Sequence, residues 1–372
     1  MATDILDLSP CVWHSSCVGT ESTLHQIAPY VGKMKSKMAR VLIELASSPG
    51  ETIFEPFIGS GLVALESLIL GRSVVCCDTN PYAIVLTKGK LFPPPDLNYA
   101  IRQAEKYLDE SANNLSYFDI NQVPVWVQDF FHPSTLKEIL SLVDILKRND
   151  ENFLLSCLLG ILHHQRPGFL SYPASHAIPY LRSKKFPKTA YPQLYEYRAL
   201  RPRLLRKIER SYKRFPQVNP LLHKDCYLQD VTTLNLPKNS VDAVITSPPY
   251  MNALDYIRDN RLRLWFLGYG DKASLLKGEP MNIERFKKLM RGCFKTIDFA
   301  LRPDGKCYFV MGEVTKGKSH VDTASVIVDI ALELGSFKCE LIAEDNVPQD
   351  RRVRKTGKQV KKEYIVVLRK KV

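Results

Sequence analysis

The chain has 372 residues, 45% of them hydrophobic, and carries a formal net charge of +13. This length and apolar content suit a packed core in one large domain or two, and they exclude a disordered or fibrous chain. The longest apolar run, Phe153 to Leu162, is about half of the roughly 20 residues that a membrane span needs, and no signal-peptide pattern precedes it, so we expect a cytoplasmic protein without a membrane partner.

A strand, a glycine turn, a helix and a second strand follow one another in the first part of the chain. Thr52 to Phe57 reads as a short buried strand that breaks at Gly59-Ser60-Gly61, and the apolar residues after the turn recur at helical spacing. Ser73 to Asp78 is a continuous apolar strand that ends in an acid. This order predicts a βαβ unit, and therefore parallel strands in a sheet covered by helices on both faces.

The glycine turn and the acid point to a nucleoside site. Gly59, Gly61 and Ala64 have the spacing that lets a backbone turn tightly and approach a ligand at a helix N-terminus. Asp78 is placed to accept hydrogen bonds from ribose hydroxyls, which suits NAD as well as other nucleoside cofactors. Glu55, just before the turn, would repel a pyrophosphate but attract the ammonium and sulfonium groups of S-adenosylmethionine, and so favours that cofactor.

The character of the chain changes after Pro93. Apolar residues at helical spacing predict helices from Leu97 and from Thr135, and Thr135 and Glu138 form a capping-box pattern. Residues 166–215 hold thirteen Lys and Arg against two Glu, a net charge of +11, with Tyr and Phe between them. This composition is typical of a surface that binds a polyanion.

A second motif follows the predicted strand Val241 to Thr246. Ser247-Pro248-Pro249-Tyr250 fixes a rigid loop at the carboxyl edge of the sheet, where ligands of such folds bind. The proline carbonyls and the Ser247 hydroxyl suit an exocyclic NH₂ group of a nucleobase, and the Tyr250 ring offers a face for stacking. The motif therefore indicates a catalytic loop that acts on a base amine.

Three further strands are predicted at Lys306 to Met311, Lys338 to Ala343 and Tyr364 to Leu368. Residues 351–371 hold ten Lys and Arg against one Glu, a net charge of +9, so a second basic segment lies near the end of the chain. Nine cysteines occur without any C-x-x-C pair, so we expect reduced thiols and no metal site.

Together, "FEPFIGSG", "CCD" and "TSPPY" resemble the S-adenosylmethionine-dependent amino-methyltransferases of DNA, which make N4-methylcytosine or N6-methyladenine. The resemblance implies an α/β, Rossmann-like class I methyltransferase sheet of seven strands, the last antiparallel, with an inserted and mostly helical target-recognition domain. We expect the cofactor-binding part at residues 1–95, the inserted domain at 96–221 and the catalytic part at 222–372.

The resemblance also implies which residues form the site. The cofactor would contact Glu55, Phe57, Gly59, Gly61, Asp78 and Asp230, with Asp230 near its adenine. The catalytic residues would be Ser247, Pro248, Pro249 and Tyr250. From the basic segments, the expected DNA contacts are Arg182, Lys184, Lys185, Arg201, Arg203, Arg206, Arg351 and Arg352.

The implied reaction is methyl transfer from S-adenosylmethionine to the N4 amine of a cytosine flipped out of double-stranded DNA. Such an enzyme would be nucleoid-associated in a prokaryote or phage host, and a restriction endonuclease that acts separately is a candidate partner. N6-adenine methylation and methylation of an RNA base stay open. A nucleic-acid-binding module with a relic cofactor site is a third alternative. An NAD oxidoreductase is the fourth, although it has no use for Ser-Pro-Pro-Tyr.

Overall fold

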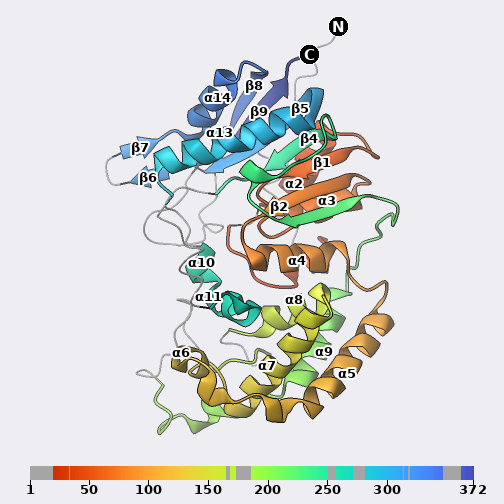
Figure 1. The fold of residues 1–372 in the computed structure, drawn as a ribbon, viewed down its shortest axis with the longest axis vertical. Coiled ribbons are helices and arrows are strands. Elements are labelled where there is room, and N and C mark those ends of the chain that lie inside the picture. Colours follow the sequence, from red (N-terminus) through yellow and green to blue (C-terminus); the bar gives the residue numbers. More distant parts are fainter. Residues whose placement is uncertain are drawn as a thin grey trace.

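The computed structural model describes residues 20–32, 34–164, 168–172, 186–249, 256–270, 281–312, 314–316, 319–346 and 362–372. Its upper part in Figure 1 is a seven-stranded sheet in the order β3-β2-β1-β4-β5-β9-β8. The strands are β1 Thr52–Glu55, β2 Ser73–Asp78, β3 Lys224–Leu228, β4 Val241–Thr246, β5 Leu301–Gly312, β8 Phe337–Asn346 and β9 Lys362–Lys370. A separate hairpin is formed by β6 Val314–Lys316 and β7 Ser319–Val321.

The direction of the strands matches the expected fold. The strands β3, β2, β1, β4 and β5 pair in parallel, whereas β9 is antiparallel to both β5 and β8. The predicted seven-stranded α/β sheet with its last strand antiparallel is therefore confirmed. Chain order reverses between β1 and β4, and in open sheets of this kind ligands bind at the carboxyl ends of the strands at such a switch point.

Helices cover both faces of the sheet. One face is covered by α2 Ser36–Ala46, α3 Leu62–Ile69 and α4 Pro81–Leu91, the other by α13 Ile283–Ala300 and α14 Thr323–Glu333. Successive strand residues point to opposite faces: Ile53 packs in the core beneath α2, and Phe54 packs in the core beneath α13. Burial on both faces explains why β1, β2 and β4 read as continuous apolar runs.

A helical part lies on the far side of α4 from the sheet (Figure 1). Its helices are α5 Leu97–Asn113, α6 Val125–Gln128, α7 Pro133–Arg148, α8 Asn152–Ile161 and α9 Leu200–Ser211. Next to them lie three short helices from later in the chain: α10 Tyr256–Asp259, α11 Arg261–Leu264 and the π-helical η6 Trp265–Tyr269. Short 3-10 helices are η1 Thr23–Gln26, η2 Leu115–Tyr117, η3 Ile120–Gln122, η4 Pro192–Tyr195 and η5 Val231–Thr233. The described part of residues 96–221 contains helices and no strand.

One apolar core joins this helical part to the rest of the chain. Residues of α5, α7, α8 and α9 pack in it together with Tyr82 and Leu86 of α4, and with Leu262 and Phe266 from the segment after the Ser-Pro-Pro-Tyr motif. The helical part is thus continuous with the helices on the sheet. The limits of the inserted domain, residues 96 and 221, stay a prediction.

The apolar run Phe153 to Leu162 is accounted for by this core. It forms α8 and the residue after it, and every one of its side chains is buried. Among the described residues, no helix combines the length and the apolar character that a membrane crossing would require.

The predicted capping box at Thr135 and Glu138 is wrong. Helix α7 begins at Pro133, and its N-cap is His132, whose Nδ1 accepts from the Ser134 N–H at 3.2 Å. The Thr135 hydroxyl instead donates to the Arg198 carbonyl at 3.0 Å, and Glu138 accepts from the Leu200 N–H at 2.8 Å. Both side chains therefore fix the start of α9, a tertiary role that local sequence does not reveal.

Close packing at α8 gives a testable stability effect. A Cβ on Gly160 would lie 2.1 Å from the Ile27 carbonyl oxygen, so alanine there forces two backbones apart. Overpacking of this kind costs about 1–3 kcal/mol or more, which exceeds the gain of about 1 kcal/mol from higher helix propensity. Gly160→Ala should therefore lower the free energy of unfolding in urea by about 2 kcal/mol. Gly168→Ala, where no atom lies within 4 Å, is the matched control, and equal effects of the two would refute the packing argument.

Candidate active site at the carboxyl edge of the sheet

The turn after β1 requires glycine at two positions. Gly59 has φ +49° and Gly61, the N-cap of α3, has φ +68°, both in the left-handed region that favours glycine. A Cβ on Gly61 would lie 2.6 Å from Thr87 Oγ1 of α4, so the turn packs tightly against that helix. The Ile58 N–H donates to the Cys77 carbonyl at 3.0 Å and joins the turn to β2. The predicted glycine turn is thus a fixed loop at the start of a helix.

Asp78 holds this turn in place. Its Oδ2 accepts from the Gly59 N–H at 2.9 Å, and its Oδ1 accepts from the Asn80 N–H at 2.8 Å. Burial raises the pKa of the Asp78 carboxyl, against the lowering effect of the backbone N–H groups of Asn80, Gly59 and Thr79. The carboxylate therefore has a fixed orientation, and its remaining lone pairs are available to hydroxyl donors of a ligand.

Glu55 is a buried carboxyl at the end of β1. Its side chain is only 4% exposed, and within the described residues its Oε2 has no hydrogen-bond partner. Burial raises the pKa of Glu55 well above its usual range, and the neighbouring Asp78 raises this pKa further, whereas Lys90 opposes the increase. An acid in these surroundings binds a cation favourably, because a positive charge would offset the cost of its burial.

Buried polar atoms without partners occur at the ends of three adjacent strands. Besides Glu55 Oε2 after β1, they are Asn80 Nδ2 just after β2 and Thr246 Oγ1 at the end of β4, none of which has a partner among the described residues. Native proteins satisfy the large majority of buried polar side-chain atoms, so such atoms need an explanation. Their position at the β1–β4 switch point indicates a polar ligand.

The second motif lies at the same edge. Ser247, Pro248 and Pro249 follow β4, whose Val244 is paired with Phe54 of β1, so Ser247 leaves the sheet at the edge where β1 ends. Pro248 is buried, and Ser247 and Pro249 are half-buried. Tyr250 lies outside the described residues.

Asp230 and Phe57 take separate places near this edge. Asp230 follows β3, is exposed, and caps η5 by accepting from the Thr232 N–H at 2.8 Å. The preceding Gln229 donates its N–H to the Asp78 carbonyl at 3.1 Å, which ties the loop after β3 to the end of β2. Phe57 is half-buried and packs against the core beneath α13. The structure thus brings Glu55, Gly59, Asp78 and Asp230 to one edge of the sheet.

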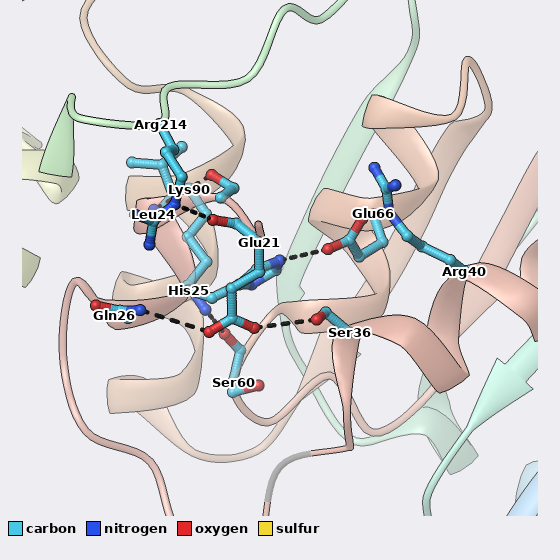
Figure 2. Close-up of polar contacts among 11 residues, drawn as sticks. Glu21, Leu24, His25, Gln26, Ser36, Arg40, Ser60, Glu66, Lys90 and Arg214 are labelled. Carbon is cyan, nitrogen blue, oxygen red and sulfur yellow. Dashed lines mark hydrogen bonds and ion pairs between the residues drawn. The ribbon is translucent and has the colours of Figure 1, made fainter. Parts of the chain in front are cut away.

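Sequence reasoning missed two residues that support the glycine turn. Lys90 of α4 is 2% exposed, and its Nζ donates to the Ser60 carbonyl, as Figure 2 shows. The ring of Tyr30 lies against Gly59, where an added Cβ would be 3.3 Å from Tyr30 Cε1. Both contacts join residues about 30 positions apart, and no local pattern marks them. The only sequence signal is a lysine within an apolar helical face.

A polar cluster joins the segment before β1 to α3. His25 Nε2 lies 2.7 Å from Glu66 Oε1, and Arg40 Nε donates to Glu66 Oε2 at 2.7 Å (Figure 2). His25 and Glu66 are almost fully buried, and burial lowers the pKa of His25 despite its hydrogen bond to Glu66. This cluster joins α2 and the segment that precedes Tyr30 to α3, and the Tyr30 ring lies against Gly59. At the N-cap of α2, Lys35 Nζ is a further buried atom without a partner among the described residues.

The expected DNA contacts divide into three groups. Arg201 is engaged in ion pairs with Glu105 and Asp109 of α5, and Arg203 donates to the Ala199 carbonyl at 2.9 Å. Arg206 is exposed on α9, and Arg210 and Lys213 nearby are exposed as well. The remaining five, Arg182, Lys184, Lys185, Arg351 and Arg352, lie outside the described residues.

Comparison with known proteins finds similarity to DNA methyltransferases. Residues 30–157 match the family model described as D12 class N6 adenine-specific DNA methyltransferase. The chain is 25% identical over 275 residues to the type II methyltransferase M.BsoBI of Geobacillus stearothermophilus. The aligned residues make up 67% of this chain and 54% of M.BsoBI. The type II methyltransferase M.MvaI of Kocuria varians is 27% identical over 123 residues, 30% of this chain and 27% of its own length.

A solved SAM-dependent methyltransferase of Methanosarcina mazei is 10% identical, with a TM-score of 0.38, over 89% of this chain and 97% of that one. The chain spans about half the length of M.BsoBI. The family match includes the glycine turn and Asp78, whereas the Ser247 motif lies outside it. The similarity is therefore to DNA methyltransferases, and the matching family model is that of adenine-specific enzymes.

Proposed function

We propose that this protein transfers a methyl group from S-adenosylmethionine to an exocyclic amine of a base in DNA, with the N4 amine of cytosine as the leading candidate. The observation that carries the proposal is the set of buried polar atoms at the ends of β1, β2 and β4 that have no partner among the described residues, at the edge where Ser247 and Pro248 follow β4. A cofactor site and an amine-binding loop then share one edge of the sheet.

The residues at this edge fit the chemistry of the cofactor. Asp78 would accept hydrogen bonds from the ribose hydroxyls, since its carboxylate is already fixed by the Gly59 and Asn80 N–H groups. Glu55 would attract the ammonium group and the sulfonium, which explains an acid that is otherwise unpartnered on one oxygen within the described residues. S-adenosylmethionine supplies a methyl group that its sulfonium makes reactive toward nucleophiles.

The chain would prepare the amine for transfer. An aryl amine is a poor nucleophile because its lone pair is delocalised into the ring, so it must be held pyramidal and in line with the methyl group. The Ser247 hydroxyl and the Pro248 carbonyl are proposed to accept its N–H bonds and to increase electron density on nitrogen. Tyr250 is proposed to stack on the base and to recover part of the few kcal/mol that flipping it out of the duplex costs.

DNA is the proposed partner of the helical part. Arg206, Arg210 and Lys213 are exposed at and just after α9, where they would contact phosphates without sequence preference. Residues 96–221 are proposed to recognise the target sequence, and residues 1–95 and 222–372 to bind the cofactor and the flipped base.

N6 of adenine is the second candidate. The family model that matches residues 30–157 is that of adenine-specific enzymes, whereas serine at position 247 resembles the N4-cytosine enzymes. Both reactions use the same amine chemistry at the same loop.

Mass spectrometry of nucleosides from duplex DNA incubated with the protein and isotopically labelled S-adenosylmethionine tests the proposal. We expect labelled N4-methylcytosine, and a loss of at least about 10-fold in rate for Ser247→Ala, since a buried donor left without its acceptor costs about 1–3 kcal/mol and each 1.4 kcal/mol is about tenfold in rate. Ser48→Ala, an exposed residue before β1, is the matched control. Labelled N6-methyladenine would correct the base, and label in RNA but not in DNA would refute the proposed substrate.

A further inference from the structure

Arg263 of α11 is a buried cation that the proposed mechanism does not use. Its side chain is 8% exposed, and its Nε donates to the Leu159 carbonyl of α8 at 3.2 Å. Its guanidinium carbon lies 5.5 Å from the centre of the Tyr82 ring of α4. Among the described residues it forms no ion pair with a carboxylate. Burying an unpaired charge is costly, so this arrangement calls for a reason beyond packing.

A continuous series of contacts leads from Arg263 to the glycine turn. The Tyr82 hydroxyl donates to the Pro29 carbonyl at 2.8 Å, and the Tyr82 ring stacks on Tyr30 with centroids 6.0 Å apart and planes 21° apart. Tyr30 lies against Gly59, whose N–H is held by Asp78. Arg263, Tyr82, Tyr30 and Gly59 therefore form one row of touching groups that ends where the cofactor is proposed to bind.

The other end of this row is fixed to the segment that follows the catalytic motif. Leu262 and Leu264 flank Arg263 and are buried in the core of the helical part. On the exposed side of α11, the Arg261 guanidinium stacks 4.1 Å above the Trp126 ring of α6. Helix α11 is thus held by the helical part on two sides and by α4 through Arg263.

We propose that Arg263 is a positioning residue that couples occupancy of the glycine turn to the placement of the segment after Ser247-Pro248-Pro249-Tyr250. The inference rests on the proposed function. A cofactor packed on Gly59 would limit the freedom of Tyr30 and, through the stacked rings, of Tyr82. The face of Tyr82 then fixes the guanidinium of Arg263, and with it α11. Coupling through packed side chains of this kind has to be shown by measuring it.

Hydrogen exchange of the full chain with and without S-adenosylmethionine measures this coupling directly. In the wild type we expect the cofactor to slow exchange in residues 59–65 and also in residues 256–267. Arg263→Met should keep the slowing at 59–65 and lose it at 256–267, and Arg263→Lys should restore part of it. Arg148→Met, which changes an exposed arginine of α7 outside this row of contacts, should behave as the wild type.

Kinetics and a second variant separate coupling from damage to the fold. Arg263→Met should lower kcat for methyl transfer about 3- to 30-fold while the Kd of S-adenosylmethionine changes much less, because the cofactor residues stay in place. Tyr30→Leu breaks the row at its other end and should likewise remove the slowing at 256–267.

Different results would overturn the proposed cofactor site and the proposed coupling. Absence of any cofactor-dependent slowing at 59–65 in the wild type would overturn the proposed cofactor site, and the coupling with it. Slowing at 59–65 without slowing at 256–267 in the wild type would overturn the coupling alone. Slowing at 256–267 that persists in Arg263→Met would also overturn it.

Discussion

Glu55→Gln is expected to weaken S-adenosylmethionine binding about 30-fold or more and yet to stabilise the unliganded protein at neutral pH. Loss of one partner from a buried charge pair costs about 2–5 kcal/mol, and every 1.4 kcal/mol is tenfold in affinity. Without ligand, however, the Glu55 carboxyl is unfavourable at neutral pH, because it must either keep a proton that the unfolded chain releases or carry a charge that is almost fully buried at the end of β1. Removing the carboxyl should increase the free energy of unfolding by about 1 kcal/mol, as is common when a functional residue that destabilises the unliganded fold is replaced.

The pH dependence of the unfolding free energy, compared between the wild type and Glu55→Gln, gives a sharper test. The pKa of Glu55 in the folded protein is raised well above its usual range, first by burial and then by Asp78. The folded state therefore holds a proton that the unfolded state releases. The stability that this proton contributes is fully present below the usual carboxyl pKa and is lost as the pH rises through the raised pKa. Glutamine does not titrate, so the unfolding free energy of Glu55→Gln should depend less on pH in that window.

The affinity for S-adenosylmethionine should change with pH in the opposite direction to the stability of the unliganded protein. A cationic ligand prefers the ionised carboxylate, so wild-type affinity should increase as the pH rises through the raised pKa, and Glu55→Gln should show no such increase. Calorimetric titration and chemical denaturation at several pH values measure both quantities. Glu44→Gln, an exposed acid on α2, is the control. Unchanged affinity in Glu55→Gln would show that the cofactor does not use this carboxyl.

The parts of the site that sequence predicted depend on short-range patterns. Gly59, Gly61 and Asp78 belong to one strand–turn–helix–strand unit, and the positions of the glycines and of the acid follow from backbone geometry alone. The last antiparallel strand could likewise be predicted, because its apolar run is continuous and the resemblance supplied its direction. These features could be predicted from the sequence because no tertiary contact replaces the local contacts that define them.

The parts that sequence did not predict depend on contacts between distant positions. Thr135 and Glu138 have the composition of a capping box, but α9 offers them better partners more than sixty residues away. Arg201 reads as a free basic residue, yet it is paired with acids of α5. Lys90 reads as surface charge on a short helix, whereas it is buried beneath the glycine turn. In each case a charge or hydroxyl is satisfied by a partner 30 or more positions away in the sequence.

Asp78→Asn is expected to weaken S-adenosylmethionine binding about 100-fold and to lower the free energy of unfolding by about 1–3 kcal/mol. The two oxygens of Asp78 accept from two backbone donors, the N–H groups of Gly59 and Asn80. Asparagine has one acceptor oxygen, so one donor would face its NH₂ group and stay unsatisfied, which accounts for the loss of stability. Cofactor affinity should fall because the hydrogen bonds from the ribose hydroxyls to the charged carboxylate are also lost, and a hydrogen bond to a charged group contributes about 1.5–3 kcal/mol.

An aspartate that caps a helix elsewhere in the chain distinguishes this effect from the loss of any backbone-bound aspartate. Asp96 caps α5 by accepting from the Tyr99 N–H at 2.8 Å, is exposed, and belongs to the helical part. Asp96→Asn should change stability by less than about 1 kcal/mol, because asparagine is as good an N-cap as aspartate, and should leave cofactor affinity unchanged. If the two variants lost affinity equally, Asp78 would act only through overall stability. A selective loss in Asp78→Asn would instead identify the end of β2 as the ribose site, because the turn and the ligand would then depend on the same carboxylate.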